Sequence, residues 1–305
     1  MGKIAFVFSG QGAQYPGMGR ALYERSEAAR RVFDAADALR PDTSRQCFEG
    51  TAEELCETKN TQPCMFTVEL AAAAALQEAG ITADMAAGFS LGELAALTFA
   101  GAMDFETGFQ LVCRRACHMQ RAAEQRETAM AAVLKLDNDT VRALCARFSE
   151  VYPVNFNCPG QVTVSGLADQ IAALSAAVKE AGGRAVPLKV RGGFHSPFMN
   201  SAAEAFSADL AQAQLQAPQL PVYANLTAQP YTQDVRGLLT KQICSPVLWE
   251  DSVRSMIAAG ADTFIELGPG RTLCGLITKT DKAVRTYAAE QAADLEKTIS
   301  EVHSC

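Results

Sequence analysis

Short apolar runs alternate with longer amphipathic segments over most of the chain. The runs at residues 3–8, 85–89 and 263–267 are too short for helices, and a glycine or a serine follows each of them, so we expect buried strands. A fourth strand is expected at residues 222–225. The segments between these runs carry apolar residues at helical spacing. Strands that alternate with helices predict a parallel sheet.

Three of the helical segments carry specific expectations. Residues 20–39 keep one amphipathic pattern, which predicts a single long helix. Pro63 suits the first turn of the next helix, which continues to about residue 79, because a first-turn position needs no backbone N–H donor. Asp104 is placed to cap a helix that runs to about residue 125. Further helices are expected at residues 202–213, 233–243 and 249–259, and after Gly268-Pro269-Gly270.

Residues 129–191 have a pattern of their own, in which strands and helices follow in the order β-α-β-β-α-β. These elements are expected at residues 129–136, 139–148, 151–155, 161–165, 169–181 and 184–190. This order is typical of a ferredoxin-like unit. We therefore expect a large α/β domain formed by residues 1–128 and 192–305, with residues 129–191 inserted as a small domain.

The composition bounds the class of protein. Of the 305 residues, 49% are hydrophobic and 20% are charged, which is enough for a large core. The formal net charge of −7 and the absence of basic runs argue against nucleic acid as a partner. The apolar runs are too short to span a bilayer and the first residues lack the apolar region of a signal peptide, so we expect no membrane partner.

The cysteines point to a reducing compartment. There are ten of them, with no C-x-x-C pair and no companion residues at the spacing of a zinc site. We therefore expect free thiols, no metal site and a cytoplasmic location.

Ser90 lies in Gly88-Phe89-Ser90-Leu91-Gly92, where a strand pattern changes to a helical one. A serine between glycines at such a turn is typical of a nucleophile elbow, because the glycines allow close approach and the strained turn exposes the hydroxyl. Glu93 follows in the first turn of the helix, whose N-terminus favours developing negative charge. The alternative is an ordinary tight turn.

A serine nucleophile needs a base, and the chain has three histidines. His195 is favoured because it lies in the loop Gly192-Gly193-Phe194-His195, and catalytic groups concentrate in loops held by a rigid scaffold. His118 lies within a predicted helix, where a core or surface role is the alternative. His303 lies near the end of the chain, where termini tend to fray.

The loop Gly10-Gln11-Gly12 follows the first expected strand. It does not fit a dinucleotide-binding G-x-G-x-x-G motif, because the sixth position is Tyr15. A loop at this place can instead present a backbone N–H beside the elbow. Together with the N–H of Leu91 it would form a two-donor oxyanion hole, a device in which each donor contributes a few kcal/mol.

Several dispersed motifs in a fixed order are more specific than the elbow alone. They are Phe8-Ser9-Gly10-Gln11-Gly12-Ala13-Gln14, Thr61-Gln62-Pro63, Gly88-Phe89-Ser90-Leu91-Gly92-Glu93, Arg115 with Met119-Gln120, Asn155-Phe156-Asn157 with Pro159-Gly160-Gln161-Val162, Phe194-His195-Ser196, and Glu266-Leu267-Gly268-Pro269-Gly270. On these residues the chain resembles the malonyl-CoA:acyl-carrier-protein transacylases and the related acyltransferase domains of polyketide synthases, over nearly its whole length. We expect the fold class α/β, with an α/β-hydrolase-like parallel-sheet core and an inserted ferredoxin-like small domain.

The resemblance implies transfer of a malonyl group from malonyl-CoA to the phosphopantetheine thiol of an acyl carrier protein, in support of fatty acid or polyketide synthesis. Ser90 would be the nucleophile, which forms a malonyl-serine intermediate, and His195 would be its base. The backbone N–H groups of Gln11 and Leu91 would hold the oxyanion. The family orients its histidine with a backbone carbonyl, here that of Gln242. No cofactor is implied, since coenzyme A enters as part of the thioester substrate.

Arg115 is the implied ligand of the malonyl carboxylate. The residue type agrees, because a planar guanidinium can bind a carboxylate through two parallel hydrogen bonds. Arg114 points about 100° away around the same helix, so only one of the two can face the pocket. Met119 and Phe194 are the other implied substrate-binding residues, and a bulky residue at position 194 is similar to the malonyl-type acyltransferases.

Phe89 departs from the family pattern, in which a histidine usually precedes the nucleophile. That histidine is not the base, so we expect the chemistry to survive. Two other hypotheses stay open. One is a serine hydrolase or thioesterase with the same elbow, and the other is a non-catalytic homologue that binds a carrier.

The carrier protein implied by the resemblance is acidic, and the chain itself is acidic. Docking would therefore need a local basic patch, since complementary charge is what steers such an encounter. The candidates are Arg184, Lys189, Arg191 and Arg271.

Overall fold

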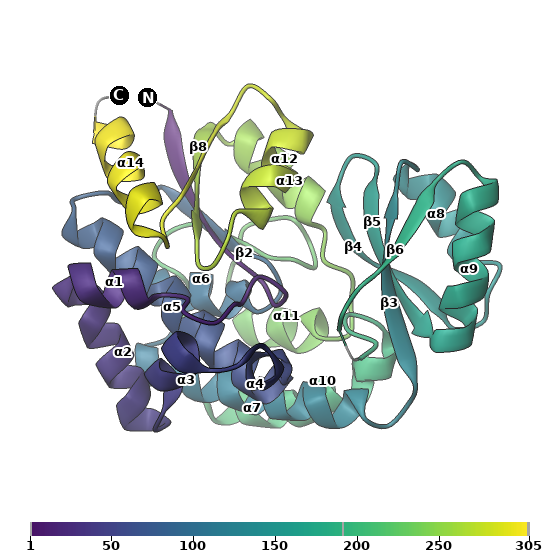
Figure 1. Ribbon diagram of the computed structural model, residues 1–305, viewed down its shortest axis with the longest axis horizontal. Helices are drawn as coiled ribbons and strands as arrows, with labels where there is room; N and C mark the ends of the chain where they lie inside the picture. The colour runs from purple at the N-terminus through teal and green to yellow at the C-terminus, as the bar shows by residue number, and fades with distance from the viewer. Residues whose placement is uncertain (1, 191, 304–305) are drawn as a thin grey trace.

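A five-stranded parallel sheet forms the centre of the larger part of the molecule. The computed structural model describes residues 2–190 and 192–303. The strands lie in the order β7-β2-β1-β8-β9, and every neighbouring pair is parallel. Figure 1 shows two of them, β2 and β8, on the side of the molecule away from the strands β3 to β6. Their bounds are β1 (Lys3–Phe8), β2 (Met85–Gly88), β7 (Val222–Tyr223), β8 (Ala261–Leu267) and β9 (Arg285–Ala288). Phe8 pairs with Gly88 and Leu267, so three strands end at the same edge.

Alternate residues of β1 face two different helical layers, as the pleat of a strand requires. Phe6 and Phe8 belong to the core shared with one layer, and Ala5 and Val7 to the core shared with the other. The first layer contains α2 (Glu27–Leu39), α5 (Thr58–Glu78), α6 (Gly92–Phe99) and α7 (Phe105–Ala123). The second contains α12 (Trp249–Ala258) and α13 (Thr272–Thr280).

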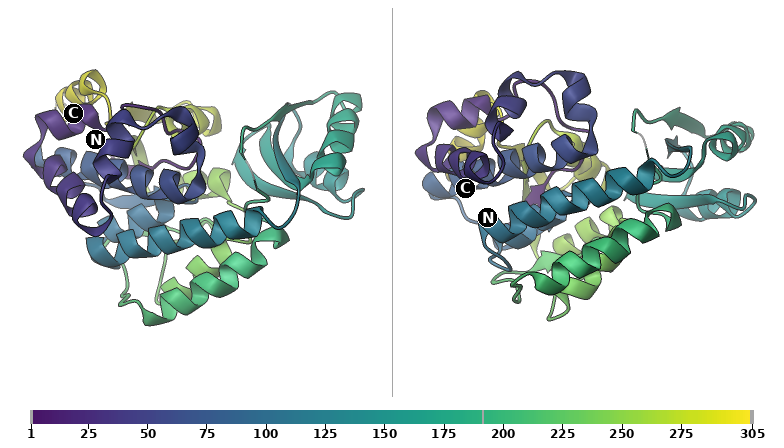
Figure 2. Two further views of the ribbon diagram at one scale, coloured as in Figure 1. Left: turned by 60° about the horizontal axis from the view of Figure 1, so that its bottom comes forward. Right: turned by 90° about the horizontal axis from the view of Figure 1, so that it is seen from below.

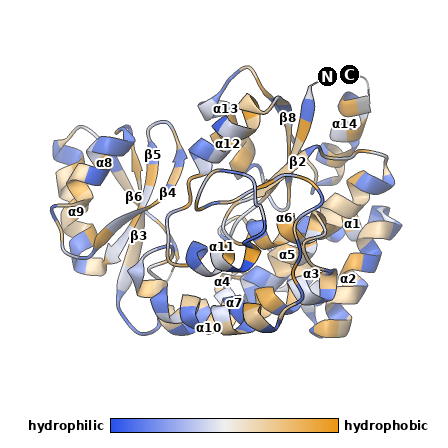
Figure 3. Cartoon of the chain, turned by 180° about the vertical axis from the view of Figure 1, so that it is seen from behind, coloured by the Kyte–Doolittle hydropathy of each residue, from blue (hydrophilic) through white to orange (hydrophobic). Residues whose placement is uncertain are grey.

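The hydropathy of the helices follows their burial. The helices α5 and α6 are buried along almost their whole length and carry mostly apolar residues (Figure 3). The helix α10 (Asn200–Gln212) packs beside α7, and the two run together toward the smaller part of the molecule (Figure 2). Among the described residues, none of the helices combines the length and the apolar character that a membrane span requires.

The smaller part is a four-stranded antiparallel sheet with its own core. Its elements are β3 (Thr128–Leu134), α8 (Asn138–Cys145), β4 (Val151–Cys158), β5 (Gln161–Leu167), α9 (Ala168–Glu180) and β6 (Arg184–Pro187). The strand order β4-β5-β3-β6 is that of a ferredoxin-like sheet. The predicted fold class is therefore confirmed, while the exact domain boundaries stay a prediction. Backbone hydrogen bonds from Phe156 to Val247 and from Val247 to Val154 join β4 to the larger part.

Two expected helices begin or end differently from the prediction. Residues 20–39 form not one helix but two, α1 (Arg20–Arg25) and α2, because Ser26 is extended and its Oγ accepts a hydrogen bond from the N–H of Ala29 at 3.0 Å. An N-cap serine starts a new helix at this point, which the amphipathic pattern did not reveal. Pro63 lies inside α5 and not in its first turn, since that helix begins at Thr58.

The predicted strand at residues 129–136 ends at Leu134, and the cap at Asp104 is confirmed, because its carboxylate accepts the N–H of Thr107 at 2.8 Å. Among the described residues the prediction missed five elements, most of them short. They are α3 (Thr43–Glu49), α4 (Ala52–Cys56), the 3₁₀ helix η1 (Pro197–Met199), β9 and α14 (Ala292–His303).

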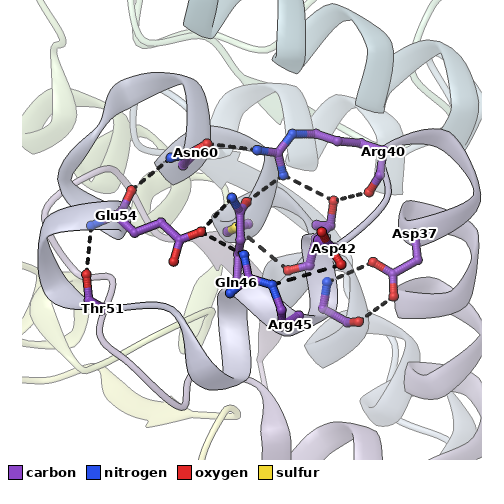
Figure 4. Close-up of polar contacts among 11 residues, drawn as sticks. Asp37, Arg40, Asp42, Arg45, Gln46, Thr51, Glu54 and Asn60 are labelled. Carbon is purple, nitrogen blue, oxygen red and sulfur yellow. Dashed lines mark hydrogen bonds and ion pairs between the residues drawn. The ribbon is translucent and has the colours of Figure 1, made fainter.

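A polar network, here called the Arg40 cluster, holds α3 and α4 against the start of α5 (Figure 4). It comprises Arg40, Arg45, Gln46, Glu54 and Asn60. Arg40 donates to Gln46 Oε1 at 2.6 Å and to Asn60 Oδ1 at 2.8 Å. Glu54 Oε1 accepts from Arg45 at 2.8 Å and from Gln46 Nε2 at 3.0 Å. The cluster therefore fixes the first turns of α5, which carry Gln62.

Candidate active site

Ser90 occupies a strained turn between β2 and α6, with a φ of +55°. Such a conformation is costly for a residue other than glycine and persists only where its surroundings impose it. The flanking glycines are required by space. A Cβ added to Gly88 would lie 1.9 Å from the backbone of Gly92, and one added to Gly92 would lie 2.3 Å from the carbonyl oxygen of Phe8. Strand, turn and helix thus form the elbow that the sequence pattern predicted.

Ser90, His195 and the backbone carbonyl of Gln242 form a hydrogen-bonded series. Ser90 Oγ lies 2.6 Å from His195 Nε2, and His195 Nδ1 lies 3.0 Å from Gln242 O. His195 comes from the loop after β6, and Gln242 ends α11 (Val235–Gln242). A histidine held by a carbonyl through Nδ1–H presents its Nε2 lone pair to the serine, so the arrangement can remove the Ser90 proton.

Burial keeps His195 neutral. The side chain is almost completely enclosed, and its pKa falls to about 4 because burial disfavours the charged form and the Arg115 cation adds to the effect. The hydrogen bond to Gln242 opposes this shift only in part. At neutral pH the imidazole is therefore unprotonated and can accept a proton.

The predicted oxyanion donors lie at the ends of neighbouring strands. Gln11 follows β1 and Leu91 follows Ser90 at the start of α6. Within the described part of the chain, neither backbone N–H donates a hydrogen bond. The Gln11 side chain is tied back to Thr58 Oγ1 at 3.3 Å. Gly10 touches the elbow so closely that an added Cβ would lie 2.8 Å from Phe89, which brings the loop against the turn.

Arg115 lies beside the nucleophile and is completely buried on α7. Its Nη2 donates to Ser90 Oγ at 3.2 Å and to the side-chain oxygen of Gln242 at 2.9 Å, and its Nη1 donates to Gln62 Oε1 at 2.9 Å. Its Nε is buried and, among the described residues, has no partner. Arg114 instead has a 63% exposed side chain and forms an ion pair with Asp209.

The Arg115 guanidinium stays charged at neutral pH despite its burial. Desolvation lowers its pKa to about 10, and the negative charge of Glu93 opposes this shift. A fixed, dry cation next to a nucleophilic hydroxyl can bind a substrate anion.

Met119 and Phe194 are each next to a residue of the site, Met119 through its contact with Gln62 and Phe194 as the residue before His195. Met119 lies one turn beyond Arg115 on α7, and its sulfur accepts a hydrogen bond from Gln62 Nε2 at 3.5 Å. Phe194 is buried beside Gly192, where an added Cβ would lie 2.9 Å from the Phe194 ring. Gln62 therefore links the two predicted substrate-binding residues of α7.

Sequence reasoning did not assign Gln62, Glu93, Asn225 or Tyr231 to the site. Signals existed for three of them. Gln62 lies in one of the motifs that carry the resemblance, Glu93 lies in the first turn after the elbow, and Asn225 ends a predicted strand at the sheet edge where sites form. Tyr231 carried no signal, because its place depends on how a loop returns to the core.

The Phe89 side chain contacts Trp249 and Gly10 of the loop after β1. Its ring packs edge-on against Trp249 at 5.5 Å between centroids and an angle of 63°. The indole Nε1 of Trp249 is buried and has no partner among the described residues. The residue that departs from the family pattern therefore fills an apolar space behind the elbow.

The other histidines lie elsewhere. His118 contacts Asp209 at 2.7 Å between α7 and α10, and the side chain of His303 lies outside the described residues. All nine cysteines in the described ranges are free thiols. Across those ranges no group of three or more His, Cys, Asp or Glu side chains could hold a metal ion.

Comparisons with known proteins agree on one family. Residues 5–300 match the model of the acyl transferase domain. The malonyl CoA-acyl carrier protein transacylase of Bacillus subtilis (strain 168) is 41% identical over 98% of this chain and 97% of its own length. The structure of the protein of that name from Clostridium perfringens superposes with a TM-score of 0.96 at 34% identity, over 99% of this chain and 98% of that one. A malonyl-transacylase solved with its type II PKS acyl-carrier protein gives 0.94 at 32% identity, over 98% and 99%.

Proposed function

This chain belongs to the acyl transferase domain family, and from that membership and the geometry of the site we propose how it acts. It is an acyltransferase that carries a malonyl group from malonyl-CoA to the phosphopantetheine thiol of an acyl carrier protein. The resemblance noted in the sequence is thereby confirmed at the level of the family. The roles of individual residues described next are proposals, and so is the cytoplasmic location.

The observation that carries the proposal is the position of Arg115. Its buried guanidinium lies within hydrogen-bonding distance of Ser90 Oγ, and its Nε–H has no protein acceptor among the described residues. A carboxylate that took this Nε–H and the Nη2–H now given to Ser90 would form a bidentate pair. Malonyl thioesters carry such a carboxylate close to the reacting carbonyl, whereas simple acyl thioesters do not.

In the first half of the reaction, Ser90 attacks the malonyl thioester. His195 Nε2 takes the hydroxyl proton as the bond from Ser90 Oγ to the carbonyl carbon forms. The N–H groups of Gln11 and Leu91 stabilise the oxyanion. The carbon–sulfur bond then breaks, and coenzyme A leaves with the proton that His195 returns to its sulfur.

In the second half, the carrier thiol gives its proton to His195 and attacks the malonyl-serine ester. The new carbon–sulfur bond forms, the bond to Ser90 Oγ breaks, and Ser90 recovers its proton from His195. Transfer rather than hydrolysis requires that water is badly placed. An acyl group held at its far end by Arg115 leaves a water molecule little freedom of approach.

The test is the intact mass of the protein after mixing with malonyl-CoA, for the wild type and for Ser90→Ala. We expect a stable malonyl adduct on the wild type that the variant lacks. Rapid release of free malonate without an adduct would favour a serine hydrolase instead. If neither an adduct nor turnover were found, both malonyl transfer and hydrolysis would be contradicted. A non-catalytic homologue that binds a carrier would then be favoured.

We further propose that Arg184 and Lys189 guide the acidic carrier to the site. Both side chains are exposed, whereas Arg271 is engaged with Asp294 at 2.9 Å and Arg191 lies outside the described residues. Reversing both charges with Arg184→Glu and Lys189→Glu should raise KM for the carrier more than KM for malonyl-CoA. If KM for the carrier were equal in the wild type and the double variant, Arg184 and Lys189 would not belong to the docking surface.

A further inference from the structure

Glu93 is a completely buried carboxylate whose oxygens accept three hydrogen bonds. Tyr231 Oη donates to Oε1 at 2.5 Å, the backbone N–H of Asn225 donates to the same oxygen at 3.1 Å, and Gln242 Nε2 donates to Oε2 at 2.8 Å. All three partners are donors, which suits an ionised carboxylate, since that group only accepts. Burying a charged carboxylate is costly in free energy unless hydrogen bonds and a nearby opposite charge compensate for the lost hydration.

The first neighbour is Gln242, the residue whose backbone carbonyl orients His195. Its side-chain amide donates to Glu93 and to Ser90 O, the latter at 2.7 Å, while its oxygen accepts from Arg115. The carboxylate on one side and the cation on the other allow only one orientation of this amide. Glu93 therefore fixes Gln242. That residue contacts the nucleophile Ser90, the base His195 and the guanidinium of Arg115.

The second neighbour is Asn225, which holds the strained elbow. Asn225 Oδ1 accepts the N–H of Ser90 at 2.7 Å, and its Nδ2 donates to Gly88 O at 2.6 Å. Glu93 in turn anchors the Asn225 backbone. The positive φ of Ser90 thus depends on a side chain that Glu93 keeps in place.

Glu93 also balances the charge of the site. Its carboxylate is linked to the Arg115 cation through the Gln242 amide, and it raises the pKa of that guanidinium against the effect of burial. A buried cation without a counter-charge would be expensive to maintain. The Arg115 cation therefore depends on the charge of Glu93, although the two side chains are joined only through the amide of Gln242.

We propose that Glu93 is a positioning residue, which acts through Gln242 and Asn225 where other serine enzymes place a carboxylate directly on the histidine. The inference rests on the proposed roles of Ser90 and His195. A buried acid with a purely structural role would lower stability when lost and leave the reactivity of Ser90 intact. Loss of Glu93 should instead lower the reactivity of Ser90.

The test uses Glu93→Gln in the full-length protein and two readouts. The first is the rate at which a fluorophosphonate probe labels Ser90, which needs no malonyl-CoA. The second is kcat and KM for malonyl transfer. We expect labelling and kcat to fall about 100-fold, as when reacting groups are displaced by about 1 Å, with a smaller change in KM.

The matched control is Glu266→Gln. Glu266 is also completely buried, and it accepts the backbone N–H groups of Leu273 and Cys274 at 3.0 and 2.7 Å, at the start of α13. This variant should lower the melting temperature and leave the labelling rate unchanged. If Glu93→Gln did the same, the proposal would be overturned.

The dependence of the Ser90 labelling rate on pH is a further readout, and a purely structural role of Glu93 would not change it. Burial raises the pKa of Glu93 to about 7, and the ionisable groups that face it are Tyr231 and Arg115. Wild-type labelling should therefore decline as the pH falls through about 7, and Glu93→Gln should lack this step. His195 titrates near 4 and cannot produce it.

A second variant covers the case in which Glu93→Gln fails to fold. Tyr231→Phe removes one donor and touches none of the reacting groups. The Tyr231 hydrogen bond lowers the pKa of Glu93, so its loss should move the step to higher pH. An unmoved step would contradict the inference. A wild type that is labelled by the probe but never malonylated would instead refute the proposed function and leave this test valid.

Discussion

Two polar clusters with an arginine at the centre have opposite electrostatic character. In the Arg40 cluster, hydrogen bonds to Glu54 raise the pKa of Arg45, and the same bonds lower the pKa of Glu54, so each charged form is favoured. Around Ser90 the dominant effect is burial. It lowers the pKa of Arg115 and raises that of Glu93, against their mutual attraction.

The same contrast appears in the hydrogen-bond inventory. Arg40 donates only to neutral oxygens, and within the described residues none of its cluster's side chains has a buried atom without a partner. Arg115 has an Nε–H without an acceptor in the part of the chain that the structure describes. A network whose charged forms are favoured and whose donors all have acceptors stabilises the fold. A network that is desolvated and retains a donor without an acceptor is instead suited to bind a substrate.

The sharpest test of this contrast is Arg115→Gln. We expect kcat/KM for malonyl-CoA to fall on the order of 1,000-fold, because two charge-assisted hydrogen bonds to the substrate carboxylate contribute about 2 kcal/mol each. Acetyl-CoA lacks that carboxylate and should be affected far less. Arg114→Gln, one position away and exposed, is the control and should behave as the wild type. Equal losses with both thioesters would show that Arg115 supports the nucleophile and does not bind the carboxylate.

The buried histidine makes stability depend on pH. The folded-state pKa of His195 is about 4, below the ordinary value of 6.5, so its contribution is present above pH 6.5 and is lost as the pH falls from 6.5 through 4. Between pH 6.5 and 5 the free energy of unfolding should drop by up to about 2 kcal/mol from this group. Urea unfolding of wild type and His195→Gln at both pH values measures it.

The variant should lack this part of the pH dependence, while His118→Gln, at a partly buried position beside Asp209, should retain it. A wild-type curve that matches His195→Gln at both pH values would mean that the imidazole is not held neutral.

The Arg40 cluster should respond in stability alone. Arg40→Met keeps the aliphatic stem but leaves the oxygens of Gln46 and Asn60 without their donor, which should cost about 1 to 2 kcal/mol of unfolding free energy in a partly buried place. Malonylation of the folded protein should stay within about 2-fold of the wild type, a margin smaller than the rate effects of positioning groups. A large loss of rate with normal stability would mean that the cluster controls Gln62 through α5.

The smallest effect is expected at Phe89. Its side chain packs on Trp249 and against Gly10, and none of its atoms hydrogen-bonds Ser90 or His195 among the described residues. Phe89→His, which restores the family's usual residue, should change the malonylation rate by less than about 3-fold and lower stability by about 1 kcal/mol, since apolar packing is exchanged for a polar ring. Denaturant unfolding and single-turnover mass spectrometry check both. A rate change above 10-fold would show that the elbow senses this side chain.

Much of the fold followed from local patterns. Four of the five strands of the parallel sheet, the β-α-β-β-α-β order of the small domain and the glycines around Ser90 all depend on residues within a few positions of one another. The single helix predicted over residues 20–39 was wrong, because one serine side chain capped a new helix and outweighed the amphipathic pattern. Pro63 is displaced because α5 begins at Thr58, where the N–H groups of Asn60 and Thr61 already donate to Glu57 O before the proline is reached.

The sequence by itself determined which chemistry was available: a serine in an obligate tight turn, a histidine in a loop, and an arginine of the right type on a helix. The tertiary structure decided which of these groups meet and in which protonation state. Glu93, Asn225 and Gln242 are separated by up to 149 residues, and their hydrogen bonds exist only after the sheet and helices have packed. Burial sets the pKa values of His195 and Arg115 in the same way. Backbone preferences act over a few residues, whereas desolvation and contact depend on the whole fold.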